Sequence, residues 1–563
     1  MTSLALQLGL VLALFVVCVF APGFFFLRRL AWSPMEKLAG SIGLSLIMLY
    51  LVAWEHYCLS LGTGARLFYG ISAISVALGV VARKDLLRML RASRVRGALL
   101  GFSFLVVWTL LILFMIRNYS GAGWFGDWLE HFQRTLFFLH HLPPDTTLLG
   151  GYQLPARPPM MNVLASFFLA QTEDRFEIFQ VVFTLLNLLV YLPCCLILPA
   201  LAGLRRGKVL PLAALFALSP VVMEAATYTW TKSLTAFFVV LALWFYLAGW
   251  RKKDRGRMLA AFLALSAGLL VHYSAGPYCA FIGLHYLLCV FSKRDQKWRE
   301  LAIIATACLL LLLTWFGWSI ATYGAHVTFA SNTSVTSSAV HSGSNLKKIV
   351  ANIYDSVVPR VFREPSSIHQ WDQPNLARVV RDNAFIFYQT NVIFGMGLTS
   401  GPLVLGLLYG VFRHSHGRSV ERLFWLAMIP FCVVVGIAVV GERDHWGAAH
   451  LTLLSLEVLG ISMLVASFPL RRVAGVALIV GCIVDFSLGV FLHVRMENIV
   501  NSAQRTVLPV GVLPGLTFLG DHLENLWFCR LNSELLLLLF LGLIWTLWKR
   551  LSDKSLHDRR LRE

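Results

Sequence analysis

The chain has 563 residues, of which 58% are hydrophobic and only 14% are charged. Soluble domains average about a quarter charged residues, so this composition excludes a soluble globular domain and indicates a polytopic membrane protein. The formal net charge of +19 is divided among many short loops between apolar runs. That distribution argues against a nucleic-acid-binding surface and is typical of basic cytoplasmic loops.

Apolar runs separated by charged loops predict an all-α bundle of about fifteen spans. The first run is too long for a signal peptide and no A-x-A-like cleavage site follows it, so we expect it to be retained. The spans are expected near 4–27, 39–61, 67–83, 98–117, 176–202, 209–223, 233–250, 258–271, 277–291, 301–320, 396–412, 423–440, 447–468, 473–493 and 535–548.

Basic loops in the cytoplasm place the N-terminus outside and the C-terminus inside. This topology gives three long outer loops, at 118–175, 321–395 and 494–534. The ten cysteines lie mostly in apolar runs and form no CxxC motif, which favours buried small side chains over a disulfide framework or a thiolate zinc site.

The first outer loop contains the stretch GAGWFGDWLEHFQR, in which four polar residues recur at helical spacing. Asp127, Glu130, His131 and Arg134 would share one face of a juxtamembrane helix. One interpretation is an interfacial amphipathic helix whose polar face meets water. The other is a functional site.

The same loop continues with two proline pairs, at 143–144 and 158–159. Proline pairs favour an extended path, so Arg157 is expected on a rigid turn that leads into a second, apolar helix.

Three further groups of polar residues lie where predicted spans meet the outer face. For Lys232, the other interpretation is a side chain that extends to the membrane interface. For His272, it is a structural role. Because all these stretches fall on one face in this topology, we expect a polar cavity that opens outward. The residues are Glu224 with Lys232, His272 with Tyr273, and Arg443 with His445.

This pattern resembles the GT-C superfamily of polyprenyl-phosphate-sugar-dependent glycosyltransferases, in particular protein O-mannosyltransferases and the aminoarabinose transferase of lipid A. GDWLEHF stands where that family carries an acidic residue on an outer juxtamembrane helix, and RPPMMN where a Pro-Pro turn opens a later helix. The resemblance implies a GT-C-like catalytic core at 98–450, including the outer loops 118–175 and 321–395. It leaves 1–97 as a three-span N-terminal addition, and 451–563 as C-terminal spans with a basic cytoplasmic tail.

The resemblance implies an inverting transfer of sugar from a polyprenyl-phosphate donor to a glycan, lipid or protein acceptor. Asp127 would be the base that takes the acceptor proton. The sequence departs from the family at YTWTKSL, where Lys232 replaces the aspartate of a Thr-Asp pair. No cofactor is therefore expected to be required, although a divalent metal stays possible, and the lysine would hold the donor phosphate. The expected substrate-binding residues are Glu130, His131, Arg134, Arg157, Glu224, Lys232, His272, Tyr273, Arg443 and His445.

Two other classes of function remain open. A transporter or flippase for a lipid-linked or anionic solute would use the same charges as a pathway, but the long outer loops and the lack of a visible internal repeat argue against it. A non-catalytic scaffold would leave the dense outer charges unexplained. We expect an integral protein of a bacterial inner membrane, with its site on the periplasmic side, in contact with membrane lipids and without a nucleic-acid partner. The sequence identifies neither the sugar nor the acceptor.

Overall fold

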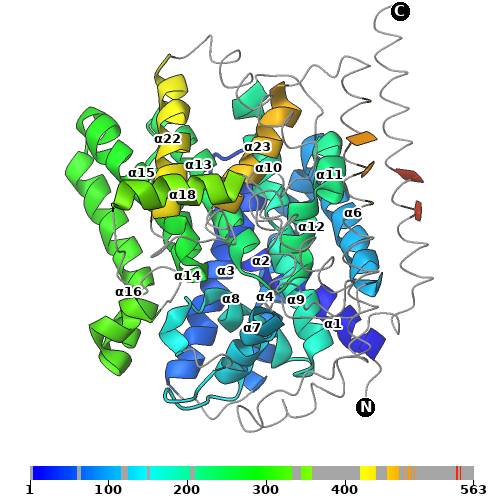
Figure 1. Ribbon diagram of the computed structural model, residues 1–563. Coiled ribbons are helices and arrows are strands. Elements are labelled where there is room, and N and C mark those ends of the chain that lie inside the picture. Colours follow the sequence, from blue (N-terminus) through cyan, green and yellow to red (C-terminus); the bar gives the residue numbers. More distant parts are fainter. Residues whose placement is uncertain are drawn as a thin grey trace, which may run out of the picture.

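The computed structural model describes residues 4–59, 65–115, 125–148, 153–202, 209–331, 344–357, 419–438 and 453–467, together with a few isolated residues beyond. Within these ranges every regular element is a helix, and the helices form one bundle (Figure 1). The predicted all-α class is confirmed.

Seven helices in the described ranges are long and apolar enough to cross a membrane. Two bent helix pairs raise this number to nine if each pair is one span. The prediction of a polytopic membrane protein is confirmed. Its count of about fifteen is not tested, because the expected spans at 396–412, 473–493 and 535–548 lie wholly or almost wholly outside the described residues. The seven are Leu6–Leu27, Pro34–Cys58, Ser93–Leu113, Phe176–Pro199, Lys232–Lys252, Tyr273–Lys293 and Lys297–Ala330, and the bent pairs are Ala65–Val81 with Arg83–Leu90 and Val209–Leu218 with Val221–Thr227.

The helices follow the predicted apolar runs closely. The short elements labelled η are 3-10 turns, except η5, which is a π-helical turn. In chain order the elements are α1 (Leu4–Cys18), α2 (Ala21–Leu27), α3 (Pro34–Cys58), α4 (Ala65–Val81), α5 (Arg83–Leu90), α6 (Ser93–Met115), α7 (Phe125–Leu139), η3 (Leu154–Ala156), α8 (Met160–Leu169), α9 (Phe176–Leu188), α10 (Tyr191–Ala202), α11 (Val209–Leu218), α12 (Pro220–Thr227), α13 (Lys232–Lys252), α14 (Arg255–Val271), η4 (Tyr273–Ala275), α15 (Gly276–His285), η5 (Tyr286–Val290), η6 (Phe291–Lys293), α16 (Lys297–Ala330), α18 (Asn345–Val357), α22 (Ser419–Ala438) and α23 (Leu454–Ser467).

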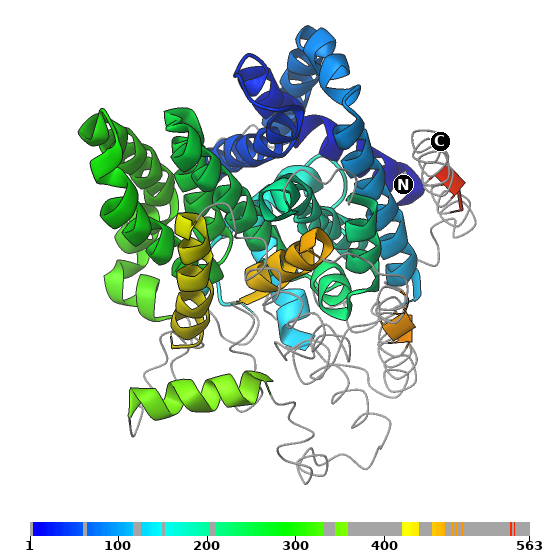
Figure 2. The same ribbon diagram turned by 90° about the horizontal axis from the view of Figure 1, so that it is seen from above.

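The helices α9, α10 and α13 form the centre of the bundle. The apolar segment of α9 and α10 is 100% buried and that of α13 is 89% buried, whereas that of α16 is only 17% buried. Seen from above, the helices from the middle of the sequence are surrounded by the N-terminal helices on one side and by α16 on another (Figure 2). The central helices therefore meet protein on all sides, and α16 has a face left for lipid.

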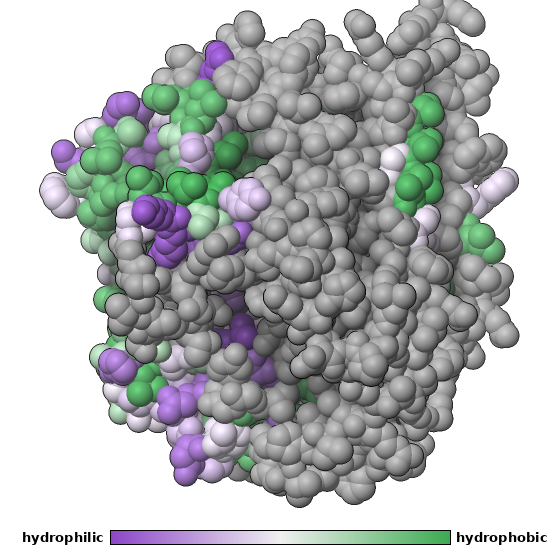
Figure 3. Space-filling view, viewed as in Figure 1, coloured by the Kyte–Doolittle hydropathy of each residue, from purple (hydrophilic) through white to green (hydrophobic). Residues whose placement is uncertain are grey.

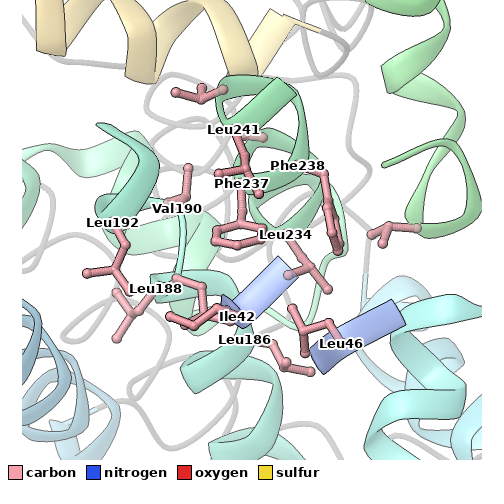
Figure 4. Packing of buried hydrophobic residues seen from close by; sticks show 14 of the residues in the cluster. Ile42, Leu46, Leu186, Leu188, Val190, Leu192, Leu234, Phe237, Phe238 and Leu241 are labelled. Atoms are coloured by element: carbon pink, nitrogen blue, oxygen red, sulfur yellow. The ribbon is translucent and has the colours of Figure 1, made fainter. Parts of the chain in front are cut away.

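The core packs apolar side chains from α3, α9, α10 and α13 against one another (Figure 4). α3 approaches α13 closely at Gly43, where a Cβ atom would lie 2.8 Å from Leu241 Cδ2. Small residues allow helices in a membrane to approach in this way. The N-terminal helix α3 is thus packed directly against the centre of the bundle.

The peripheral helix α16 carries large apolar side chains on its outer surface. Leu309, Leu310 and Leu313 are all exposed. The flank of the molecule on which α16 lies in Figure 1 shows hydrophobic residues in its upper half in Figure 3, with hydrophilic residues toward its lower end. An apolar surface on a helix of this length is expected to contact lipid.

Local sequence explains how α13 joins α14 in an antiparallel pair. Lys253 adopts a left-handed conformation with φ of 51° after the end of α13. Asp254 follows as the N-cap of α14, and its side chain accepts a hydrogen bond from the Arg257 backbone N–H at 2.8 Å. The tight turn brings the end of α14, at His272, back to the level at which α13 begins.

Candidate active site

The polar residues predicted to share a helix all lie on α7, at the lower end of the bundle in Figure 1. Glu130, His131 and Arg134 are each 1% exposed. A polar face that meets water would be exposed, so the interpretation of α7 as a simple interfacial helix is wrong. Asp127 belongs to α7 by its backbone, while its side chain lies outside the described part of the structure.

One carboxylate, that of Glu130, binds two guanidinium groups. Arg134 Nε donates to Glu130 Oε1 at 2.8 Å, and Arg157 Nε donates to Glu130 Oε2 at 3.0 Å. Arg134 also donates to the backbone carbonyls of Leu154 and Gln153, at 2.7 and 3.3 Å. We call Glu130, Arg134 and Arg157 the Glu130 cluster. Among the described side chains, it joins two guanidinium groups to one carboxylate.

The Arg-Pro-Pro sequence explains how Arg157 reaches this cluster from 27 residues away. A residue before proline is restricted to extended conformations, and Arg157 has φ of −136° and ψ of 138°. The preceding turn, η3, presents its carbonyls to Arg134, and α8 begins directly after Pro159. Arg157 is 17% exposed on its side chain, so it is the member of the cluster that a ligand reaches most easily.

His131 contacts residues of α8 and α9. Its Nδ1 lies 3.2 Å from Asn162 Oδ1, and its ring lies 5.9 Å from the ring of Phe183. An amide oxygen only accepts hydrogen bonds, so His131 Nδ1 must carry the proton and donate it. The proton-free nitrogen of the neutral ring is then Nε2.

Lys232, the first residue of α13, is only 7% exposed. Its ammonium lies 3.6 Å from the centre of the Trp230 ring. A cation over an aromatic face is stabilised there, but the N-terminus of a helix is itself electropositive and disfavours a cation. Because Lys232 is buried, the interpretation of an exposed lysine that extends to the membrane interface is excluded. The electropositive helix N-terminus makes the position suited to a bound anion.

His272 lies among these groups, directly after α14. Burial first, and then the charges of Lys232 and Arg157 and the nearby His131, hold the pKa of His272 well below its usual range. Its Nδ1 accepts a hydrogen bond from the Ser274 backbone N–H at 3.1 Å, so the neutral ring carries its proton on Nε2.

Tyr273 follows His272 and joins η4 to η3. Its hydroxyl donates to the Pro155 carbonyl at 3.3 Å. The contact fixes the turn after α14 against the turn that precedes Arg157. The end of α14 and the first outer loop are thus held together at the site.

Burial and the charges of the Glu130 cluster determine the protonation states of Glu130 and His131. Burial raises the pKa of Glu130, but the guanidinium groups of Arg157 and Arg134 outweigh it and lower this pKa to about 2. Burial lowers the pKa of His131 to about 3, helped by Arg157 and Arg134 and opposed by Glu130. At neutral pH Glu130 is therefore ionised and His131 is neutral.

Of the other predicted site residues, Glu224 lies buried on α12, the helix that precedes α13 in the chain. Arg443 and His445 fall outside the described residues. The structure thus brings together Glu130, His131, Arg134 and Arg157 with Lys232, His272 and Tyr273, from α7, η3, α13 and η4. No cluster of three or more His, Cys, Asp or Glu side chains suited to a metal ion occurs in the part of the chain that is described.

Sequence analysis missed two side chains of the site. Asn162 supports His131, and Trp230 supports Lys232. Asn162 had a detectable signal, because it is the sole amide in the apolar helix MMNVLASFFL. Trp230 had none that separates it from the aromatic residues common at membrane interfaces.

Comparison with known proteins gives one structural similarity to report. No family model and no curated protein sequence matches the chain. A crystal structure of ArnT from Cupriavidus metallidurans bound to undecaprenyl phosphate is similar over 72% of this chain and 78% of that one, at 17% identity and a TM-score of 0.37.

Proposed function

We propose that the chain is an integral-membrane glycosyltransferase that moves a sugar from a polyprenyl-phosphate donor to a glycan, lipid or protein acceptor. The observation that carries the proposal is the buried Glu130 cluster, in which two guanidinium groups share one carboxylate, with Lys232 close by. Guanidinium and ammonium groups gathered in this way are suited to bind an anion by charge-assisted hydrogen bonds. The motifs GDWLEHF and RPPMMN, which resemble the GT-C superfamily, lie on the elements that build this cluster.

In the proposed reaction, Arg157 and Lys232 bind the donor phosphate. The phosphate is charged before the reaction and gains charge as it leaves, so both cations assist binding and bond cleavage. The acceptor oxygen forms a bond to the anomeric carbon while the bond from that carbon to the phosphate oxygen breaks. The electron pair leaves with the phosphate, and the hydroxyl proton passes to Asp127. A single displacement of this kind inverts the anomeric configuration.

The proposal includes a location. The site faces the periplasmic side of a bacterial inner membrane, with the N-terminus outside and the C-terminus in the cytoplasm. The positive-inside distribution of Lys and Arg supports this orientation. Residues 98–450 would be the catalytic core, with 1–97 as an N-terminal addition and 451–563 as the C-terminal spans.

The test uses the full chain in liposomes with a labelled polyprenyl-phosphate sugar and a pool of envelope acceptors. Transfer of label to an acceptor on one side of the bilayer supports the proposal. Movement of intact donor between leaflets without transfer would indicate a flippase instead. Asp127→Asn should abolish transfer and keep donor binding, because a base acts in the transition state. Normal turnover by this variant would remove Asp127 from the mechanism.

A further inference from the structure

The amide nitrogen of Asn162 is a buried hydrogen-bond donor. The side chain is 0% exposed, and among the described residues its Nδ2 has no hydrogen-bond partner, although Oδ1 contacts His131. A buried donor left unsatisfied destabilises the fold. Asn162 lies in the first turn of α8, which is otherwise mostly apolar, so an aliphatic residue would avoid that cost. Such a group calls for an explanation, and a ligand that accepts its hydrogen bond is one.

His131 supplies the complementary group. Its Nδ1 proton is directed to Asn162, and at a pKa of about 3 the ring stays neutral. Nε2 is therefore a hydrogen-bond acceptor. The two side chains fix each other's orientation, with Nε2 of His131 as an acceptor and Nδ2 of Asn162 as a donor for a ligand.

The pair lies beside the cations proposed to hold phosphate. His131 follows Glu130 directly on α7, and both His131 and Arg157 act electrostatically on His272. Charged groups suit a phosphate, whereas a neutral acceptor and a neutral donor suit a hydroxyl, which both donates and accepts. The Phe183 ring beside His131 keeps the surroundings apolar, which strengthens such bonds.

We propose that His131 and Asn162 recognise the hydroxyl groups of the transferred sugar, with His131 Nε2 accepting one hydrogen bond and Asn162 Nδ2 donating another. This inference rests on the proposed function and adds to it the part of the site that distinguishes a sugar-bearing donor from a bare lipid phosphate. In this assignment the cations bind the phosphate of the donor, and His131 and Asn162 bind its sugar.

The test measures binding of two probes to the full chain in nanodiscs, farnesyl phosphate and farnesyl-phosphate mannose. The wild-type protein should bind the sugar-bearing probe more tightly. Asn162→Leu should reduce that preference about fivefold, as the loss of one neutral hydrogen bond implies, and leave the affinity for farnesyl phosphate unchanged. The matched control is Gln171→Leu, at the other end of the α8 segment, where both ends of the amide are already bonded to Ser72 and Phe167. It should leave the preference unchanged.

The outcomes separate the two proposals. Binding of farnesyl phosphate with an equal preference in wild type and Asn162→Leu would overturn the sugar assignment and leave the phosphate site standing. Failure of the wild-type protein to bind either probe would overturn both. If Asn162→Leu does not fold, single-deoxy analogues of the mannose probe test the wild-type protein directly. At least one should bind about fivefold more weakly than the parent, and uniform binding of the whole series would overturn the inference.

Discussion

Two buried Arg–Glu sites lie toward opposite ends of the bundle and use the same ion pair for different purposes. One is the Glu130 cluster, near His272 at the end of α14. The other joins Glu36 of α3 to Arg257 in the first turn of α14, and we call it the Glu36 clamp. Arg257 and His272 are fifteen positions apart along α14, which corresponds to about 22 Å.

The Glu36 clamp is saturated and carries no excess of positive charge. Arg257 donates to Glu36 Oε1 at 2.8 Å and to Oε2 at 3.0 Å, and it also binds Asp254 at 2.5 Å. Glu36 accepts further hydrogen bonds from the Ser33 backbone N–H at 2.7 Å and from Trp244 Nε1 at 3.3 Å. One cation thus meets two carboxylates, and every contact is made within the protein.

The Glu130 cluster has the opposite balance, because two guanidinium groups meet one carboxylate. Its most exposed member is a cation, Arg157, and a further cation lies nearby at Lys232. The comparison teaches that a buried Arg–Glu pair does not by itself indicate a binding site. A group of cations around the pair does favour the binding of an anion, because guanidinium and ammonium groups form charge-assisted hydrogen bonds with phosphate.

The largest effect is expected from breaking the Glu36 clamp. Arg257→Met leaves Glu36 as an uncompensated buried charge and should lower the free energy of unfolding by about 3–5 kcal/mol. Transfer activity per folded molecule should be kept, because the clamp lies far from the site. Unfolding in a denaturing detergent and activity of the monodisperse fraction measure the two quantities.

Controls sharpen the test of the clamp. Arg255→Met removes a more exposed arginine from the same turn and should change stability by less than about 0.5 kcal/mol. The double variant Glu36→Leu with Arg257→Met should regain much of the lost stability, since it buries no charge. Loss of donor binding in well-folded Arg257→Met would contradict the separation of the two sites.

The next largest effect is expected at Lys232, near the Glu130 cluster. Lys232→Ala should weaken donor binding and reduce turnover by at least about a hundredfold, which corresponds to about 2.7 kcal/mol. Lys252→Ala, at the other and exposed end of α13, is the matched control and should behave as wild type. Activity should survive strong chelation. A nearly normal Lys232→Ala enzyme that chelator inactivates would instead indicate a metal-dependent site.

The smallest effect is a dependence of stability on pH. The pKa of His131 is lowered to about 3 in the folded chain, against about 6.5 when unfolded. Between these values the unfolded chain binds a proton that the folded chain does not. The contribution of neutral His131 to the free energy of unfolding is therefore present in full above pH 6.5. It is lost at about 1.4 kcal/mol per pH unit as the pH falls from 6.5 toward 3.

His131→Phe should remove this contribution and flatten the decline. The measurement is the free energy of unfolding at pH 7.5, 6.5 and 5.5, for wild type and variant in the same detergent. His272, whose pKa is also lowered, leaves a residual decline in the variant. Equal slopes for the two proteins would show that His131 is not held neutral in the fold.

Some of this site follows from residue spacing alone. The i, i+4 relation of Glu130 and Arg134 places them on one helical face whatever the surroundings, and the structure shows the pair. The Arg-Pro-Pro sequence likewise requires an extended Arg157 ahead of a helix. These are local effects, set by backbone sterics and helical repeat within a few residues.

Apolar run length and the positions of Lys and Arg also determined the class of protein, because a bilayer demands long apolar helices whatever their packing. Which polar residues meet from separate elements was decided by tertiary structure. The fate of Lys232 depends on Trp230 and on the elements that cover it, and the same sequence fits an exposed lysine equally well. Arg157 reaches Glu130 across 27 residues, and Asn162 orients His131 across 31. Contacts at that separation are fixed by the packing of whole helices, in which burial turns an ordinary polar side chain into one that needs a partner.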